Sequence, residues 1–305
     1  MQATMTTQFS PQLNTAESKI FQMGRKPRAY IFGAGGSGRK LLPKILERYE
    51  VLGFVDNKAS QHKRQEMIGD YPIQSPEILK NVCFDRVVIA VLAGLEQVTE
   101  QLISYGLGYA SIDRSFVEIS VKSRILFLER LSEMLKQSEI KGSVAEGGVF
   151  QGEFAKEINR VFPEKVFYLF DTFEGFSPKD VATELESNFS AQQAGHFGIT
   201  SIDLVKDKLP HLDMCVFKKG YFPETTIDVE DTFCFVNLDF DLYNPTLAGI
   251  EFFYPRMVAG GVILIHDYFS ETYKGVAQAI DDYSMKGKSL KVLPIGDDCS
   301  VAVMC

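Results

Sequence analysis

Short apolar runs alternate with amphipathic stretches along the second half of the chain. Most of the apolar runs are followed by a helical pattern, and this alternation predicts a doubly wound α/β fold with a parallel sheet. The final segments, LKVLPIG and DDCSVAVMC, read as two strands joined by a tight turn at residues 296–298, which predicts a terminal antiparallel hairpin. The expected parallel strands are residues 143–147, 165–171, 213–218, 232–240 and 261–267.

The first half carries a smaller alternation of the same kind. An apolar strand runs into a glycine-rich turn within RAYIFGAGGSG, residues 28–38, and the helical pattern RKLLPKILERY follows. The strand VLGFVDN, the helix-start signal SPEIL and the strand DRVVIAVL come next, the last two at residues 75–79 and 85–92. These elements predict a small three-layer Rossmann-like α/β domain over residues 27–116, after a polar segment at residues 1–26.

One amphipathic helical pattern separates the two halves. It covers residues 121–142 and is closed by Gly142, so we interpret residues 117–142 as a bridging helix before a second domain at 143–305. Within that domain, residues 177–200 form the longest segment without a clear period, and we interpret them as a lid.

Composition narrows the class of protein. With 305 residues, 45% hydrophobic and 24% charged, two ordinary globular cores are expected. No run approaches the roughly 18 apolar residues that span a bilayer, so a soluble, cytoplasmic protein is expected. Five widely spaced cysteines suggest free buried thiols. A net charge of −8 does not favour binding to nucleic acid or to an anionic membrane, because both are negatively charged. Small molecules are therefore the expected ligands.

The stretch VAEGGVFQGEFAKEI, residues 144–158, predicts a ligand site. Glu146, Gly148 and Gly152 lie where a buried strand turns into a helix, and Asp171 ends the next strand 19 residues after Gly152. Glycines allow backbone to approach a ligand, and a carboxylate at the second strand end can accept two hydrogen bonds from ribose hydroxyls. A nucleoside ligand is therefore expected.

Further polar positions fall at the same predicted sheet edge. Gly220, Asp239 and Asp267 follow other strands, and ligands of open α/β sheets bind outside the carboxyl ends of the strands. Asp239 and Asp267 should be neighbours, and two carboxylates with water would suit a divalent cation such as Mg²⁺ or Mn²⁺. The alternative is that Asp239 or Asp241 caps the following helix.

The first domain has its own glycine pattern. Gly33, Gly35 and Gly38 satisfy GxGxxG, and Asp56 lies 21 residues after Gly35, near the usual place of a ribose-binding carboxylate. This pattern predicts a nucleotide-sugar or dinucleotide ligand. The alternative is a structural or dimerising domain without a ligand.

The second half contains the motifs VAEGGVFQG, YLFDTFEGF, KKGYFPET, VNLDFDLYNPT and YPRMVAGGVILIHDY. By these motifs, residues from about 120 to 305 resemble the macrocin O-methyltransferase family, which methylates sugar hydroxyls with S-adenosylmethionine, often with magnesium. The resemblance implies that Glu146, Gly148, Gly152 and Asp171 hold the cofactor, with Gly220 nearby, and that Asp239 and Asp267 hold metal. The first domain resembles nucleotide-binding domains of bacterial polysaccharide-biosynthesis enzymes.

One position departs from the family pattern. His266 stands where the family usually has the first of two consecutive acids, and an imidazole suits manganese or zinc better than magnesium. His266 could be a metal ligand, a general base or a hydrogen-bonding group. Asp239 could orient or deprotonate the acceptor hydroxyl. His196 is a second candidate base, or else an exposed loop histidine.

These features favour an S-adenosylmethionine-dependent O-methyltransferase acting on a sugar or a glycosylated small molecule, in a setting such as polysaccharide biosynthesis. A nicotinamide-dependent oxidoreductase or epimerase using the first domain is one alternative, although no YxxxK pair follows DRVVIAVL. A non-catalytic binding protein is another. Self-association as a homo-oligomer is also open.

Overall fold

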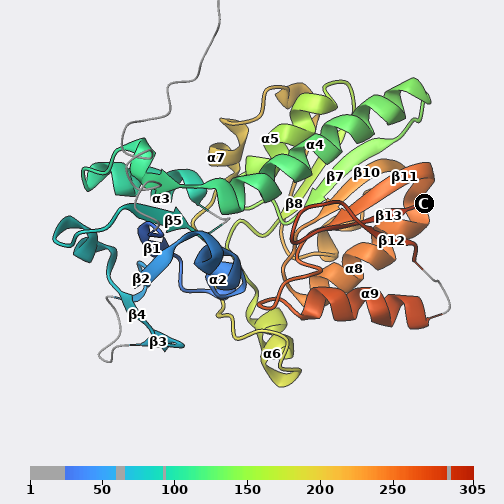
Figure 1. Cartoon of the computed structure of the whole chain (residues 1–305). Coiled ribbons are helices and arrows are strands. Elements are labelled where there is room, and N and C mark those ends of the chain that lie inside the picture. Colours follow the sequence, from blue (N-terminus) through green and yellow to red (C-terminus); the bar gives the residue numbers. More distant parts are fainter. Residues whose placement is uncertain (1–24, 60–65, 92–93, 287–289) are drawn as a thin grey trace, which may run out of the picture. The chain divides into compact units, whose positions relative to one another are not determined.

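The computed structural model describes residues 25–59, 66–91, 94–286 and 290–305. The chain divides into two compact units, residues 1–118 and 119–305, and each is described by itself (Figure 1). The predicted polar segment lies outside the described residues up to position 24, as does position 92 at the end of one predicted strand.

The first unit is a six-stranded sheet in the order β3-β4-β2-β1-β5-β6. All neighbours pair in parallel except β3 with β4, so the parallel strands follow the order 3-2-1-4-5 of doubly wound nucleotide folds. The elements are β1 (Arg28–Phe32), α2 (Gly36–Arg48), β2 (Glu50–Val55), β3 (Met67–Ile68), β4 (Tyr71–Gln74), the 3-10 helix η2 (Pro76–Lys80), β5 (Arg86–Ile89), α3 (Leu95–Ser104), the 3-10 helix η3 (Tyr109–Ser111) and β6 (Ile112–Asp113).

The second unit is a seven-stranded sheet in the order β12-β13-β11-β10-β7-β8-β9. In chain order this is 3-2-1-4-5-7-6, with parallel pairing except that β13 pairs antiparallel with both β11 and β12, so the predicted fold class is confirmed. Its elements are α4 (Ser115–Gln137), β7 (Ser143–Gly147), α5 (Glu153–Val161), β8 (Phe167–Asp171), α6 (Pro178–Glu186), α7 (Ile202–Lys206), η4 (Leu212–Met214), β9 (Cys215–Lys219), η5 (Glu224–Thr226), β10 (Phe233–Leu238), α8 (Tyr243–Phe253), η6 (Tyr254–Arg256), β11 (Met257–Ile265), α9 (Gly275–Met285), β12 (Val292–Pro294) and β13 (Val301–Met304).

The long helix α4 ends before the residue that was expected to close it. Glu139 adopts a left-handed backbone with φ of 52°, and the Ile140 N–H donates to the Leu135 carbonyl at 2.9 Å. This is the hydrogen bond of a Schellman motif, in which the left-handed position is usually glycine. The prediction that Gly142 closes the helix is wrong, because Glu139 takes the left-handed position.

The glycine pair at 260–261 lies after the start of its strand, which the sequence pattern placed at residue 261. Both residues lie within β11, and the pairing of β10 with β11 jumps from Phe233↔Met257 to Phe235↔Val262. Gly260 has a φ of 82°, which fits the irregular backbone of a bulge. The pair therefore marks an irregularity inside a strand and does not begin it.

The segment predicted as a lid contains a regular helix. Ser177 caps α6 by accepting a hydrogen bond from the Lys179 N–H, and Pro178 occupies the first helical position. A serine, a proline and an acid at Asp180 form a recognisable helix-start signal. The signal was overlooked because the helix is short and its apolar positions are few.

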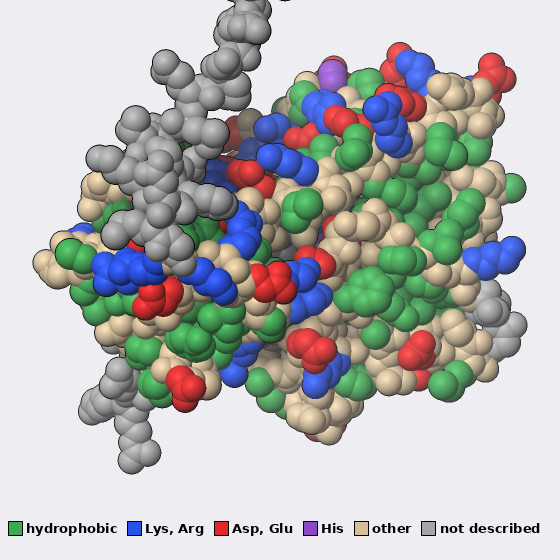
Figure 2. Space-filling view, in the orientation of Figure 1, with side chains coloured by type: hydrophobic (Ala, Val, Ile, Leu, Met, Phe, Trp, Pro, Cys, Tyr) green, Lys and Arg blue, Asp and Glu red, His purple; other side chains and the backbone are tan. Residues whose placement is uncertain are grey.

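The five cysteines are free, as expected, but their burial differs from the prediction. Cys234 is buried, whereas Cys83 is exposed and the other three are intermediate. Cys83 precedes β5 in a turn, where backbone connections run over the surface. In the part of the chain that the structure describes, no helix is long and apolar enough to cross a membrane. Figure 2 shows basic and acidic side chains interspersed on the visible face.

The glycine turn of the first unit allows a matched test of packing. A Cβ on Gly38 would lie 1.9 Å from the Gly33 carbonyl oxygen, whereas a Cβ on Gly35 would meet nothing within 4 Å. We expect Gly38→Ala to destabilise the first unit by about 1–3 kcal/mol, and Gly35→Ala to change it by less than about 0.5 kcal/mol. Hydrogen exchange of the β1 and β2 amides measures both, and equal effects would contradict the packing argument.

Candidate functional site

The turn after β7 packs directly against the end of β10. Gly148 has a φ of 81°, and a Cβ there would lie 2.0 Å from the Asp239 carbonyl oxygen. The Gly148 N–H donates to the Phe170 carbonyl, and the Asp239 N–H donates to the Gly147 carbonyl. The ends of β7, β8 and β10 are therefore fixed to one another through backbone.

Asp171, at the end of β8, holds this turn from the other side. Its Oδ2 accepts the N–H groups of Val149 and Phe150 at 2.7 and 2.8 Å, and its Oδ1 accepts the Phe173 N–H at 2.6 Å. Burial raises the pKa of Asp171, although these three hydrogen bonds oppose the shift. A carboxylate oxygen can accept two hydrogen bonds, so Oδ1 keeps capacity for one more.

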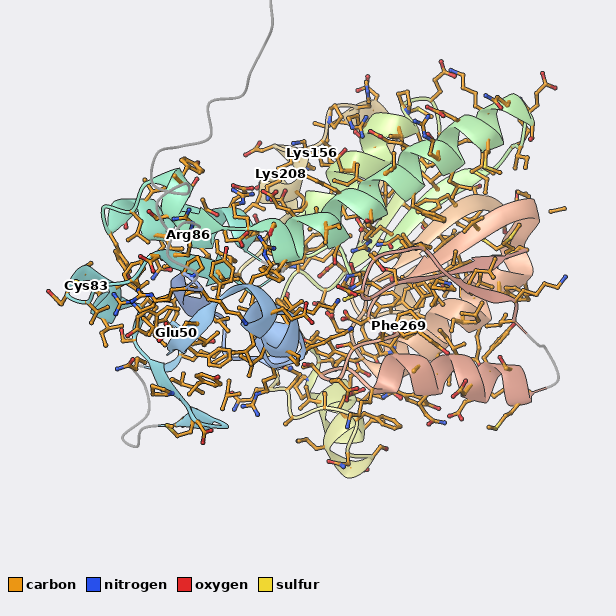
Figure 3. The ribbon with its side chains drawn as sticks, viewed as in Figure 1. Glu50, Cys83, Arg86, Lys156, Lys208 and Phe269 are labelled. Carbon is orange, nitrogen blue, oxygen red and sulfur yellow. The ribbon has the colours of Figure 1, made fainter. Side chains whose placement is uncertain are left out.

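Lys208 also holds the turn that follows β7. Lys208, labelled in Figure 3, donates from Nζ to the Gln151 carbonyl at 2.8 Å and to Glu153 Oε1 at 2.7 Å. Gly152, with a φ of 81°, precedes α5, and a Cβ there would lie 2.9 Å from Val205. Gly152 therefore allows α5 to start in contact with α7.

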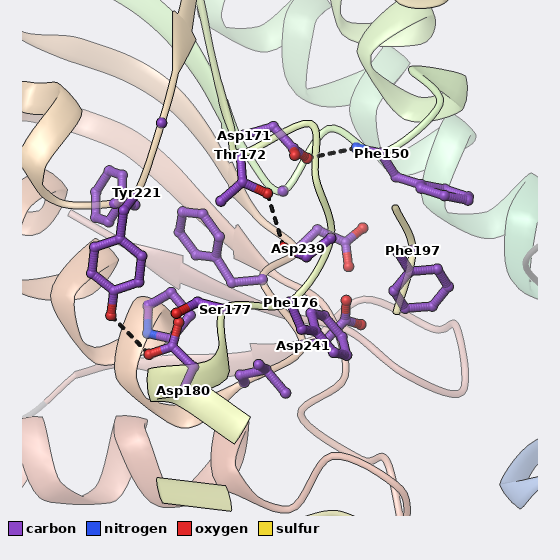
Figure 4. A pocket seen from close by; sticks show the side chains of 17 residues that line it. Phe150, Asp171, Thr172, Phe176, Ser177, Asp180, Phe197, Tyr221, Asp239 and Asp241 are labelled. Atoms are coloured by element: carbon purple, nitrogen blue, oxygen red, sulfur yellow. Dashed lines mark hydrogen bonds between the residues drawn. The ribbon is translucent and has the colours of Figure 1, made fainter. Parts of the chain in front are cut away.

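Four of the predicted positions line one pocket at this sheet edge: Gly148, Asp171, Gly220 and Asp239. The cavity has a volume of about 90 Å³ and opens to solvent. Asp241 and the rings of Phe150, Phe176 and Phe197 also line it (Figure 4). Gly152, Glu146, His266 and Asp267 are not among its lining residues.

Glu146 is sealed within the sheet. It is 1% exposed, and its Oε1 accepts a hydrogen bond from Asn237 Nδ2 at 2.9 Å. Burial and the nearby Asp239 carboxylate hold the pKa of Glu146 well above its usual value. The structure thus gives Glu146 contacts inside the protein and not with the pocket.

Asp239, His266 and Asp267 converge beside the pocket. His266 Nδ1 lies 3.1 Å from Asp239 Oδ1 and 2.8 Å from Asp267 Oδ2. Burial disfavours the charged imidazole, but the two carboxylates outweigh burial and hold the pKa of His266 well above its usual value. The pKa of Asp239 is low for the converse reason: burial opposes ionisation, but His266 and Arg124 outweigh it.

The residue types in this cluster fit a divalent cation. One oxygen from each aspartate and one nitrogen from His266 lie within 4.8 Å of one another. Two carboxylates and an imidazole are a common ligand set for manganese or zinc. A cation bound through Nδ1 would take the place of the proton between the carboxylates.

Sequence reasoning weighed Asp241 only as a helix cap, and the structure gives it another place. The residue preceding α8 is Leu242, so Asp241 does not take the N-cap position of that helix. Asp241 lines the pocket with a left-handed φ of 63°. Burial and the carboxylates of Asp267 and Asp239 hold its pKa well above the usual value. A non-glycine residue held at positive φ is a signal found only in structure.

Arg124, on α4, was not found from the sequence. Its Nη2 donates to Asn237 Oδ1 at 2.8 Å and to Asp239 Oδ2 at 2.9 Å, and its guanidinium lies 3.9 Å from the centre of the Phe154 ring. No motif marks this position, because one arginine of an amphipathic helix looks like any other. Arg124 links Glu146, through Asn237, to the acidic cluster.

Aromatic rings form one side of the pocket. The ring centres of Phe150 and Phe197 lie 5.0 Å apart, and those of Phe176 and Phe197 lie 5.4 Å apart. His196, the second candidate base, has its ring 4.3 Å from that of Phe197 and is half-buried. The structure therefore places His196 in an aromatic cluster and not among the pocket-lining residues.

In the first unit, Asp56 and two of the predicted glycines make contacts within the protein. Asp56 Oδ2 accepts the Ala34 N–H at 2.9 Å, and Oδ1 accepts the Lys58 N–H at 2.9 Å. Gly38 packs on the Gly33 carbonyl, and Gly35 faces open space. Close packing thus accounts for two of the three glycines.

Comparisons with known families give two matches. Residues 113–298 match the sequence profile of the family described as Macrocin-O-methyltransferase (TylF). Residues 25–112 match a family described as C2185-like, N-terminal. A search of the curated proteins found no match.

Several solved structures resemble the chain. The O-methyltransferase NovP is 20% identical with a TM-score of 0.49, over 63% of this chain and 82% of NovP. The calicheamicin methyltransferase CalS11 is 17% identical with a TM-score of 0.49, over 75% of this chain and 88% of CalS11. The Podospora anserina methyltransferase PaMTH1, solved with S-adenosylhomocysteine, is 15% identical with a TM-score of 0.38, over 68% of this chain and 95% of PaMTH1.

The contacts of Arg124 predict a large effect on stability. Arg124→Met leaves the oxygens of Asn237 and Asp239 buried without this donor, so we expect the free energy of unfolding to fall by about 2–4 kcal/mol. The control is Arg130→Met on the same helix, because the Arg130 side chain is 68% exposed. We expect a change below about 0.5 kcal/mol for the control. Urea denaturation measures both, and equal losses would refute the assigned role of Arg124.

Proposed function

The chain belongs to the macrocin O-methyltransferase family, and on this premise we propose that it transfers the methyl group of S-adenosylmethionine to a hydroxyl of a sugar or a glycosylated small molecule. The main support is that the glycine turn, the Asp171 carboxylate and Asp239 line one pocket, with His266 and Asp267 beside Asp239. Glycosylation chemistry in the cytoplasm, such as polysaccharide biosynthesis, is the setting that we propose.

In this proposal the cofactor lies across the strand ends. The Gly148 turn allows close approach of the sulfonium end, and Asp171 Oδ1 accepts one ribose hydroxyl. This revises the expectation of two ribose hydrogen bonds, because three backbone N–H groups already occupy Asp171. Glu146 and Gly152 support the turn from behind.

Asp239, His266 and Asp267 would hold a divalent cation. A bound cation would supply positive charge that stabilises the acceptor oxygen as its proton leaves. Arg124 keeps Asp239 oriented through Oδ2, so its Oδ1 remains directed toward His266. The acceptor oxygen attacks the methyl carbon as the carbon–sulfur bond breaks, and positioning of donor and acceptor in line supplies much of the acceleration.

The hydroxyl proton needs an acceptor, and the carboxylates of Asp239 and Asp241 line the pocket at the end of β10. Both oxygens of Asp239 already contact cationic groups, Oδ1 with His266 and Oδ2 with Arg124. Asp241 forms no ion pair with a lysine, arginine or histidine in the described part of the chain. We therefore assign proton acceptance to Asp241 and positioning to Asp239, which was the base expected from sequence.

For the first unit we propose a nucleotide or nucleotide-sugar ligand at the turn of Gly33, Gly35 and Gly38. The open space at Gly35 supports it. Self-association of the chain likewise stays a prediction.

Titration with S-adenosylhomocysteine tests the cofactor. We expect S-adenosylhomocysteine to bind to the full chain. In an activity assay, removal of metal with EDTA should abolish methyl transfer. Added Mn²⁺ should restore the activity better than Mg²⁺ does, because His266 is one of the ligands. Absence of binding would refute the proposed function. Binding with transfer unaffected by EDTA would refute the cation site alone.

The two carboxylates can be separated by isosteric variants. We expect Asp241→Asn to lower kcat by at least about 100-fold while Mn²⁺ and S-adenosylhomocysteine still bind. Asp239→Asn should weaken Mn²⁺ binding as well as kcat. Release of S-adenosylhomocysteine with a panel of glycosylated acceptors gives kcat, and Asp213→Asn, an exposed carboxylate, serves as the control. Full activity of Asp241→Asn would return the proton-accepting role to Asp239.

A further inference from the structure

Three phenylalanine rings form one side of the pocket, and we refer to them as the aromatic wall. They are Phe150 in the turn after β7, Phe176 in the segment after β8 and Phe197 in the loop before α7. Phe197 is at the centre of the wall, since its ring centre lies 5.0 and 5.4 Å from the centres of the other two rings. All three residues line the pocket and are half-buried, so apolar ring surface remains accessible to a ligand.

Two of these phenylalanines have a backbone conformation that bulky residues rarely adopt. Phe150 has a φ of 48° and Phe197 a φ of 63°, both in the left-handed region. Asp241, which lines the same pocket, has a φ of 63° as well. Backbone strain of this kind persists only where the surroundings hold it, and it is concentrated at ligand and catalytic sites. The conformation of the aromatic wall therefore indicates a function beyond packing.

The aromatic wall is held in place, because contacts fix its three segments to one another. Four hydrogen bonds join them: Thr200 Oγ1 donates to the Phe150 carbonyl, Gln151 Nε2 to the Ile199 carbonyl, the Phe176 N–H to the His196 carbonyl and the Gly195 N–H to the Phe176 carbonyl. A Cβ on Gly175 would lie 2.3 Å from the His196 carbonyl oxygen, so two of the segments also touch directly. Since the rings are ordered in advance, little affinity is lost in arranging them around a ligand.

Hydrogen-bond acceptors face the aromatic wall. Figure 4 shows the carboxylates of Asp239 and Asp241 directed toward the side of the pocket on which Phe197 lies. In the proposed function the cofactor occupies the ends of β7 and β8, at Gly148 and Asp171, and the acceptor hydroxyl meets Asp241. The acceptor then lies between the two aspartates and the aromatic wall, with apolar surface on one side and carboxylate oxygens on the other.

A pyranose ring matches this pair of surfaces. Its hydroxyl groups project around the edge of the ring, whereas its faces consist of C–H groups. Placing one face on an aromatic ring removes apolar surface from water, and the edge hydroxyls can then donate to carboxylates. A flat aromatic group would cover the wall but offer no hydroxyl to Asp241, and an open-chain polyol would offer hydroxyls but no continuous apolar face.

We propose that the aromatic wall binds the C–H face of the acceptor's pyranose ring, and that Phe197 determines this specificity. The inference rests on the proposed function, because it needs a sugar hydroxyl at Asp241. With one face on Phe197, the ring presents an edge hydroxyl to Asp241 in a defined orientation. The wall thus recognises the sugar itself, and not the group to which the sugar is attached.

Phe197→Leu tests the wall, because leucine keeps an apolar side chain but has no flat face. Steady-state kinetics on the full chain use matched methyl and phenyl glycosides of glucose, galactose, mannose and rhamnose. With the sugar that gives the fastest turnover, we expect KM to rise by at least about 10-fold for both glycosides. We expect kcat to stay within about threefold, and the affinity for S-adenosylhomocysteine within about twofold, of the wild-type values.

The outcomes separate the inference from the function on which it rests. A rise in KM for the phenyl glycoside alone would mean that the wall binds the aglycone, and an unchanged KM for both would mean that it binds no acceptor. Loss of affinity for S-adenosylhomocysteine instead would assign the wall to the cofactor. Each of these results overturns the inference and leaves the proposed function intact. Turnover of none of the glycosides would overturn the sugar acceptor of the proposed function, and this inference with it.

Phe197→Trp is the complementary variant, because the chain contains no tryptophan and an indole keeps a flat aromatic face. We expect a KM within about threefold of the wild-type value. Addition of the methyl glycoside to the S-adenosylhomocysteine complex should give a saturable change in tryptophan emission. Emission that does not respond to a glycoside that is turned over would contradict the proposal, even if Phe197→Leu does not fold.

The control is Ile199→Ala in the same loop, since Ile199 is 84% exposed and does not line the pocket. Its KM should stay within about twofold of the wild-type value. A rise in KM equal to that of Phe197→Leu would mean that any change in the loop weakens acceptor binding, and would overturn the assignment to Phe197.

Discussion

The close approach of two backbone segments is the constraint on which the candidate site depends. Gly148 leaves no room for a side chain against the carbonyl of Asp239, so the ends of β7 and β10 meet without intervening atoms. A left-handed backbone at Gly148 and the hydrogen bond from the Asp239 N–H to Gly147 hold this contact. Any bulkier residue would separate the glycine turn from the acidic cluster, and the pocket would lose its shape.

Charge balance is the second constraint on the site. Three aspartates meet at one sheet edge, and their mutual repulsion in a buried place must be offset. Arg124 and His266 supply that compensation from α4 and from the end of β11. His266 therefore stabilises the structure by offsetting the negative charges, in addition to being suited to bind a metal. An imidazole between two carboxylates supplies a positive charge where an acid would add a further negative one.

The two units use the same device at their glycine turns. Asp56 accepts the Ala34 N–H in the first unit, and Asp171 accepts the N–H groups of Val149 and Phe150 in the second. In both, an acid after the second parallel strand fixes the turn after the first. The spacing of glycines and acid thus serves the turn itself. The spacing of glycines and acid in the first unit therefore supports the prediction of the fold more strongly than the prediction that a nucleotide binds there.

The sequence by itself determined the alternation of strands and helices, the terminal hairpin and the family, because these follow from local periodicity and from contiguous motifs such as LDFDLY. It also marked Asp171 and Asp239 at strand ends. Only the tertiary structure placed Arg124 on Asp239, sealed Glu146 behind Asn237, and turned Asp180 toward the pocket. Those contacts join residues tens of positions apart, and their burial and donor geometry depend on helix packing, which no local pattern records.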